Sequence, residues 1–192
     1  MLAVLLGYLA GSVPFAYLLA RRAGIDVRLQ GSGNVGAANV LRTTGLGRAL
    51  AVMALDVGKG VAAVVLAQST TGGAALAGTA AVVGHVYPIW LRFHGGKGVA
   101  VAAGVFAVLT PVATALAAAL FVITVWATRY ISLGSVAASV VLPPTAWLTG
   151  APGAVVGAAW VAAALILFRH RANLRRLQAG TERRFRERVR PV

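Results

Sequence analysis

The chain has 192 residues, of which 59% are hydrophobic and 11% are charged, with 18 Lys and Arg against 4 Asp and Glu and a net charge of +14. Soluble domains carry about 25% charged residues and disordered chains have low hydrophobicity, so the composition excludes both classes. The chain has no Cys, which excludes disulfides and thiolate metal sites.

Long uncharged stretches predict an all-α integral membrane protein with a single domain over residues 1–192. A helix needs about 20 apolar residues to cross a bilayer core, and residues 1–20 are enough for one span. No basic residue precedes this stretch, which argues against a cleavable signal peptide. Further spans are predicted near 49–67 and 73–91.

The two remaining uncharged stretches, 98–128 and 130–168, are each too long for one ordinary span. Residues 98–128 contain Thr110-Pro111, and residues 130–168 contain Pro143-Pro144 and a turn at 150–152. Proline ends or kinks a helix, so each stretch is predicted to hold two spans, which gives seven transmembrane helices in all. The short piece before Thr110 could instead be re-entrant with its partner, which leaves five spans as an alternative.

Basic residues predict the orientation, because cytoplasmic loops are enriched in Lys and Arg. Along the seven predicted spans, charged connections (21–48, 92–97, Arg129) alternate with uncharged ones (68–72, 110–111, 149–152). This pattern predicts an outer N-terminus and a cytoplasmic C-terminus, with a basic cytoplasmic tail over 169–192. The tail should attract anionic lipid. Nucleic acid is not predicted as a partner, because Phe185 is the lone aromatic residue of the tail.

The first polar cluster follows the first span and is rich in glycine. Glycines let backbone N–H groups approach an anion, and Ser, Asn and Arg add further donors. A dinucleotide-binding motif is rejected because no strand precedes the glycines; a glycine-rich turn with a helix cap at Ser32 or Asn34 stays open. The candidate residues are Gly31, Ser32, Gly33, Asn34, Gly36, Asn39 and Arg42.

Two charged residues lie inside the second predicted span. Asp56 and Lys59 are three residues apart and therefore share a helix face. Ionisable groups inside a span are costly and are usually paired and functional. A purely structural ion pair would give the same pattern.

The second polar cluster surrounds Lys97 with glycines at the predicted start of a helix. Lys97 is one of two lysines in a chain that otherwise uses arginine, which favours a compact point charge for an anion here. Topology alone would be served equally by arginine. His85 is either a buried histidine or a substrate contact, and His94 is predicted to be solvated. The candidate residues are His85, Gly95, Gly96, Lys97 and Gly98.

Two further polar segments lie on the predicted cytoplasmic side. Ser135 is either an anion contact or a helix cap. His170 and Asn173 are three residues apart on one helix face, and Glu182 follows in the tail. The three His and four carboxylates show no metal-binding spacing and no nucleophilic triad, so no metal site is predicted. Clusters of this kind suit a phosphorylated substrate at a membrane surface.

Together, the polar clusters resemble the bacterial glycerol-3-phosphate acyltransferases that use acyl phosphate, the PlsY family. The matching segments follow the family's order with family-like spacing over nearly the whole chain. One departure is Ala38, where the family more usually has Thr. The segments are Gly31–Arg42, Leu55–Gly60, Gly84–Val99, Arg129–Ser135 and Arg169–Glu182.

The resemblance implies a reaction and a location. An acyl group would pass from acyl phosphate to the 1-hydroxyl of sn-glycerol 3-phosphate, giving lysophosphatidic acid and phosphate. The site would face the cytoplasm in a multi-pass protein of the bacterial inner membrane, with the lipid bilayer as a further partner. The resemblance implies no metal, no cofactor and no obligatory general base, because the donor's phosphate can accept the hydroxyl proton.

The resemblance also implies roles for the candidate residues. Ser32 and its backbone neighbours would hold the acyl-phosphate headgroup, and the other catalytic residues would orient glycerol 3-phosphate and neutralise charge. The predicted catalytic residues are Ser32, Arg42, Lys97, His170 and Asn173. The predicted substrate-binding residues are Gly31, Gly33, Asn34, Gly36, Asn39, His85, Gly95, Gly96, Gly98 and Ser135. The predicted supporting residues are Asp56, Lys59 and Glu182.

Two other functions remain alternatives at this point. A transporter for a phosphorylated solute would also need polar clusters, but transporters often show inverted repeats and midplane sites, whereas these clusters gather on one side. A non-enzymatic subunit that binds anionic lipid would explain the basic tail but not the glycine-rich clusters.

Overall fold

The computed structural model describes residues 1–68 and 71–185, and these residues form helices and turns without a β-strand. The predicted all-α class is confirmed. The α-helices are α1 (Leu2–Ser12), α2 (Phe15–Arg21), α3 (Ala37–Thr44), α4 (Leu46–Val65), α5 (Thr71–Val86), α6 (Val99–Leu109), α7 (Pro111–Thr128), α8 (Ile131–Leu148) and α9 (Gly153–Gln178); a 3₁₀ turn, η1 (Ile89–Leu91), follows α5.

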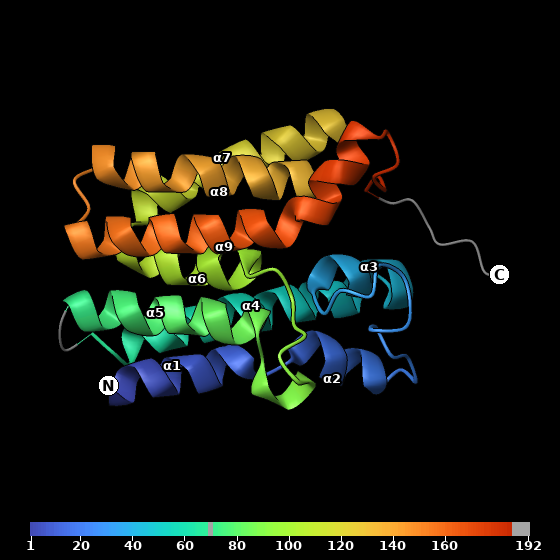
Figure 1. The fold of residues 1–192 in the computed structure, drawn as a ribbon, viewed down its shortest axis with the longest axis horizontal. Helices are drawn as coiled ribbons and strands as arrows, with labels where there is room; N and C mark the ends of the chain where they lie inside the picture. Colours follow the sequence, from blue (N-terminus) through green and yellow to red (C-terminus); the bar gives the residue numbers. More distant parts are fainter. Residues whose placement is uncertain (69–70, 186–192) are drawn as a thin grey trace.

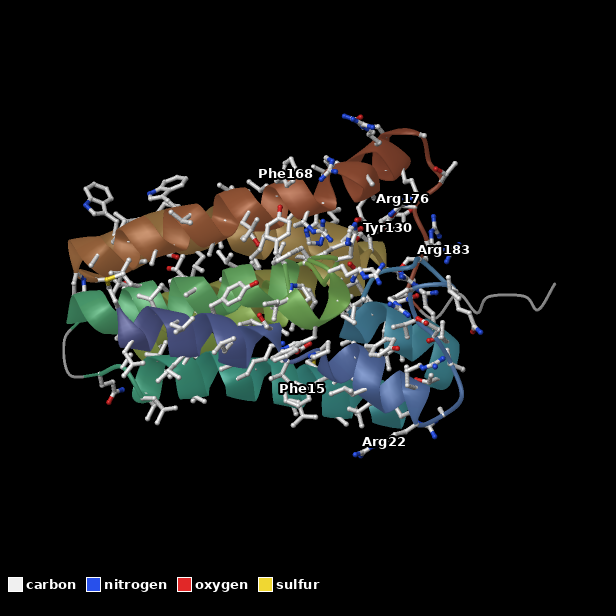
Figure 2. All side chains as sticks on the ribbon, turned by 60° about the horizontal axis from the view of Figure 1, so that its bottom comes forward. Phe15, Arg22, Tyr130, Phe168, Arg176 and Arg183 are labelled. Atoms are coloured by element: carbon white, nitrogen blue, oxygen red, sulfur yellow. The ribbon has the colours of Figure 1, made fainter. Side chains whose placement is uncertain are left out.

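The long helices lie side by side along the long axis of the molecule (Figure 1). The N-terminus lies at one end of the bundle, whereas α2, α3 and the last turns of α9 lie at the other. We call this second end the basic end, because Arg22, Arg176 and Arg183 lie there (Figure 2). The two ends of the described chain are therefore at opposite ends of the bundle, as an odd number of membrane crossings requires.

Five segments are long and apolar enough to cross a membrane, which agrees with the prediction of a multi-pass membrane protein. They are Leu2–Arg21, Gly72–Leu91, Pro111–Thr128, Ile131–Leu148 and Gly153–Gln178. The other two predicted spans correspond to α4, which carries Arg48, Asp56 and Lys59, and to α6, which has only 11 residues. The count of seven spans and their orientation stay predictions.

Prolines break the helices at one predicted position and not at another. As predicted, α6 ends before Thr110 and α7 begins at Pro111. The predicted break at Pro143-Pro144 is wrong, because α8 continues through both prolines to Leu148. Pro143 and Pro144 lack the backbone N–H groups that would bond to the carbonyl groups of Ser139 and Val140, and membrane helices tolerate such prolines more readily than soluble helices do.

Small residues allow the helices to approach closely. A Cβ added to Gly11 would lie 2.1 Å from the carbonyl oxygen of Ala81, and one added to Gly104 would lie 2.1 Å from that of Val57. These contacts pack α1 against α5 and α4 against α6. Large apolar side chains such as Trp126, which is 84% exposed, lie on the outside, where a bilayer would solvate them.

Candidate functional site

Buried polar side chains of α4 and α5 contact the backbone at the break between α1 and α2. Val13 is extended at this break, and its carbonyl accepts a hydrogen bond from Lys59 Nζ at 2.9 Å. Lys59 Nζ also lies 2.9 Å from Asp56 Oδ1 and 3.0 Å from His85 Nδ1. An ammonium group only donates, so His85 Nδ1 accepts. The predicted common face of Asp56 and Lys59 is confirmed, and His85 is buried beside them.

Asn39 shapes the glycine-rich loop before α3. The side-chain amide of this buried residue donates to the carbonyl groups of Val27 (2.8 Å) and Gln30 (3.0 Å). Its side-chain carbonyl accepts from the backbone N–H of Ser32 at 2.9 Å. A Cβ on Gly31 would lie 2.1 Å from Asn39 Oδ1, so the loop needs glycine at this point.

The tip of this loop is open to the surroundings. Ser32 and Gly33 are exposed, and Gly33 adopts a left-handed φ of 69°. α3 begins only at Ala37, after Gly36 as its N-cap residue, and no side chain caps it. A helix cap at Ser32 or Asn34 is therefore wrong, because the helix starts further along the chain.

The loop between η1 and α6 brings the first two clusters together. The backbone N–H groups of Gly95 and Gly96 donate to the carbonyl groups of Val86 (3.1 Å) and His85 (3.0 Å). A Cβ on Gly96 would lie 2.2 Å from His85 Nε2 and 2.7 Å from the carbonyl oxygen of Val35. Only glycine fits here, because the backbone lies between α5 and the loop that precedes α3.

Lys97, in the same loop, reaches α9. Its ammonium group donates to Asn173 Oδ1, and the Asn173 amide donates to Glu182 Oε1 at 2.6 Å. A carboxylate only accepts, which fixes the Asn173 side chain with its carbonyl toward Lys97. His170, buried on the same face of α9, has Nδ1 2.8 Å from the carbonyl oxygen of Ile166. Nδ1 therefore carries the proton, and Nε2 can accept a hydrogen bond.

Glu182 is held by three donors. Its Oε1 also accepts from Ser132 Oγ at 2.8 Å, and its Oε2 pairs with Arg176 Nε at 2.7 Å. Burial alone raises the pKa of Glu182, but the hydrogen bonds from Asn173, Ser132 and Arg176 outweigh it and hold the pKa below its ordinary value. Ser132 and Arg176 were not predicted as site residues. The helical spacing from Asn173 to Arg176 could have indicated the second.

Positive charge is in excess around Lys97. Burial lowers the pKa of Lys97 to about 8; repulsion by Arg176, Arg42 and Arg169 adds to this effect and attraction to Glu182 opposes it. Because Arg42 belongs to α3 and Arg169 and Arg176 belong to α9, the field at Lys97 combines the charges of both helices. Such a site suits an anionic, phosphorylated ligand.

Ser135 and His94 make their side-chain contacts outside this group. Ser135 is buried, and its Oγ donates to the carbonyl of Ile131 at 2.8 Å. Tyr130 is the N-cap residue of α8, so a helix cap at Ser135 is wrong. His94 is exposed, as predicted. Within residues 1–68 and 71–185, no group of three His, Cys, Asp or Glu could hold a metal ion.

Relatives of known name match the chain over nearly its full length. Residues 1–180 match the family model for glycerol-3-phosphate acyltransferase. The glycerol-3-phosphate acyltransferase of Myxococcus xanthus is 50% identical over 188 residues, covering 95% of this chain and 97% of the relative. Glycerol-3-phosphate acyltransferase 1 of Deinococcus radiodurans is 45% identical over 192 residues, covering 98% of this chain and 97% of the relative.

Two solved structures share the fold. Both are crystal structures of PlsY (YgiH), an integral membrane glycerol 3-phosphate acyltransferase. The glycerol 3-phosphate form matches with a TM-score of 0.93 and the lysophosphatidic acid form with 0.89. Each is 37% identical in sequence, and each match covers 96% of this chain and 94% of the solved chain.

Proposed function

The chain belongs to the glycerol-3-phosphate acyltransferase family, and on this premise we propose that it transfers an acyl group from acyl phosphate to the 1-hydroxyl of sn-glycerol 3-phosphate. The bond between the acyl carbon and the phosphate oxygen breaks and an ester bond forms. The hydroxyl proton goes to the departing phosphate. The products are lysophosphatidic acid and inorganic phosphate.

One observation carries this proposal: Lys97 and its glycines lie where two glycine-rich loops and α9 converge. Gly96 packs against Val35 of the first loop, and Lys97 donates to Asn173 of α9. Two phosphorylated reactants would repel each other in water. A convergence of fixed cations and backbone N–H groups can hold both, and orientation of bound reactants lowers the barrier.

We divide the candidate residues into those that would contact a substrate and those that would position the contacting residues. Ser32 and the exposed loop tip would hold the phosphate of the donor. Arg42, Lys97, Ser135, His170 and Asn173 would orient glycerol 3-phosphate, with His170 Nε2 accepting a hydrogen bond from a glycerol hydroxyl. Asn34, Gly33 and Gly36 would contribute to the first loop and Gly98 to the start of α6. Asn39, Asp56, Lys59, His85 and Glu182 would act through others, because Asn39 holds the first loop, Asp56, Lys59 and His85 contact one another, and Glu182 holds Asn173.

The proposed acyl transfer does not need a strong general base from the protein. Acyl phosphate is a mixed anhydride and is already activated toward attack. Negative charge grows on the carbonyl oxygen and on the leaving phosphate, and fixed donors aimed at such charge contribute several kcal/mol in other enzymes (about 2.7–4 kcal/mol for one donor). Lys97 and Arg42 supply such donors here.

We place the site on the cytoplasmic side of the bacterial inner membrane. The support is the position of Arg22, Arg176 and Arg183 at the basic end (Figure 2), since basic residues are retained on the cytoplasmic side. No feature of the relatives named above supports the transporter alternative.

The test uses purified full-length protein in detergent. Phosphate release and lysophosphatidic acid formation should require both acyl phosphate and glycerol 3-phosphate. The matched control replaces acyl phosphate by an acyl thioester with the same chain. Transfer from the thioester, and none from acyl phosphate, would overturn the proposed donor. Uptake of glycerol 3-phosphate into vesicles without acylation would favour a transporter instead.

A further inference from the structure

Arg169 is a basic residue of α9 that reaches the loop between η1 and α6 (residues 92–98), which we call the glycine loop. Its Nε donates to the carbonyl of Gly96 at 3.2 Å, and one of its terminal NH₂ groups donates to the carbonyl of Gly95 at 3.2 Å. Its guanidinium carbon also lies 5.9 Å from the centre of the Tyr87 ring. Arg169 therefore contacts the backbone and an aromatic ring of the protein, whereas an arginine that only sets topology would face lipid headgroups or water.

The two glycines are thereby held from both sides. Their N–H groups donate to the end of α5, at Val86 and His85, and their carbonyl groups accept from Arg169. An arginine fork presents its donors in one rigid plane, which matches two successive carbonyl oxygens. A lysine at the same place has a single ammonium group and cannot reproduce this planar fork.

The same face of α9 also holds the side chain that follows these glycines. Asn173 lies four residues after Arg169 and accepts from the Lys97 ammonium group. We propose that Arg169 is a positioning residue, which fixes the backbone of Gly95-Gly96 so that Lys97 points to Asn173 and to the substrate phosphate. The second part of this inference rests on the proposed function of Lys97.

The charge of Arg169 disfavours the protonated form of Lys97, so the proximity of the two residues indicates a geometric role for Arg169. Its positive charge repels the Lys97 ammonium group and contributes to the lowered pKa of Lys97. Arg176 and Arg42 act in the same direction, and Glu182 acts against them. A basic residue that served topology alone would gain nothing from lying close to Lys97. The neighbouring Arg171 is exposed and stacks on Phe168 instead.

Arg171 provides the matched control. It lies on the same helix two residues further on, is exposed, and stacks on Phe168 at 4.3 Å from the ring centre. The variants Arg169→Lys and Arg171→Lys both keep the net charge of the protein. The pair therefore separates the loss of the fork from a change of surface charge.

Two measurements test the inference in the full-length protein. In Arg169→Lys, hydrogen exchange at the Gly95 and Gly96 amides should accelerate by about tenfold or more. The guanidinium hydrogen bonds that oppose local opening of this loop are lost. The specificity constant for glycerol 3-phosphate should fall about tenfold or more, because the catalytic cation is misplaced. Arg171→Lys should stay within about twofold of the parent in both.

A double-mutant cycle separates positioning from a general loss of structure. If Arg169 acts through Lys97, then Arg169→Lys should change the residual rate of Lys97→Ala by less than about twofold. Equal behaviour of Arg169→Lys and Arg171→Lys, or full additivity with Lys97→Ala, overturns the inference. If Arg169→Lys does not fold, Arg169→Gln takes its place in the same measurements. A parent enzyme without acyltransferase activity defeats the proposed function, and the exchange data then still decide whether Arg169 holds the loop.

Discussion

Lys97, in the loop before α6, and Arg42, on α3, are the two cations of the predicted phosphate site, and their removal should show how much of the rate depends on them. In Lys97→Ala and in Arg42→Ala, the rate should fall at least about a hundredfold, since each change removes a charged contact worth roughly 3 kcal/mol. Steady-state acylation of glycerol 3-phosphate measures the effect. Full activity in either variant would show that the residue lies outside the site.

The lowered pKa of Lys97 predicts a pH dependence. Its pKa of about 8 lies below the ordinary value of 10.5, so the ammonium group loses its proton between these values, where an exposed lysine stays charged. The specificity constant for glycerol 3-phosphate should therefore fall as pH rises through about 8. Lys97→Arg keeps its charge, and its residual activity should not show this fall. Identical profiles for both proteins would contradict the assignment.

The buried pair on α4 predicts an effect on stability. Lys59→Met leaves the Asp56 carboxylate without its cation inside the bundle, which should lower the free energy of unfolding by about 3–5 kcal/mol. Adding Asp56→Asn removes the unpaired charge, so the double variant should recover part of the loss. Thermal unfolding in detergent gives the comparison, and equal midpoints for the single and double variants would count against a paired role.

At this scale, local spacing predicted pairs but not distant partners. Asp56 with Lys59 and His170 with Asn173 followed from helical periodicity alone. Arg169 and Gly96 are 73 residues apart, and Ser132 and Glu182 are 50 apart. Their contacts arise only when α9 packs beside the glycine loop and α8, which no local pattern contains.

At the scale of helices, glycines determine where packing is closest. Gly11→Ala should lower the unfolding midpoint of the protein, because its new Cβ would meet the Ala81 carbonyl oxygen at 2.1 Å. Gly58→Ala is the matched control, since nothing lies within 4 Å of a Cβ there and alanine favours helix. The control should be unchanged or slightly stabilised. Similar losses in both variants would mean that the α1–α5 contact is not specific.

Helix positions were largely predictable, and helix breaks only in part. Apolar stretches, uncharged except for Asp56 and Lys59 in the second span, predicted α1 and α4 to α9, because bilayer length and hydropathy act on each segment separately. Pro111 begins α7, yet Pro143 and Pro144 lie within α8. The break at Val13 was not predicted; there, the extended carbonyl accepts from Lys59, 46 residues away. A proline therefore permits a break, and tertiary partners decide whether one forms.

For the whole molecule, the predicted topology can be tested with single cysteines, because the chain has none of its own. Gly47, at the start of α4, and Gly153, at the start of α9, are exposed with open space around them. Gly47→Cys should react with an impermeant maleimide only from the cytoplasmic side, and Gly153→Cys only from outside. The reverse pattern would invert the orientation.

A third position distinguishes seven spans from five. Val112, in the first turn of α7, is 60% exposed. Val112→Cys should react from outside if α6 and α7 both cross the membrane. If the two helices form a re-entrant pair, this cysteine should be protected from the reagent on both sides, whereas Gly47→Cys and Gly153→Cys would behave as before.

The lengths of α5 and α6 bear on how a membrane-embedded acyl donor and a water-soluble acceptor could meet. These helices have 16 and 11 residues, which correspond to about 24 and about 16 Å, less than the roughly 30 Å of hydrocarbon. The loop that follows α5 contacts α9 through Arg169, nine residues before the last residue of that 26-residue helix, which corresponds to about 14 Å along the helix axis. The acyl chain of the proposed donor could therefore stay in the bilayer while its phosphate headgroup reacts, and only the water-soluble glycerol 3-phosphate would have to reach this loop.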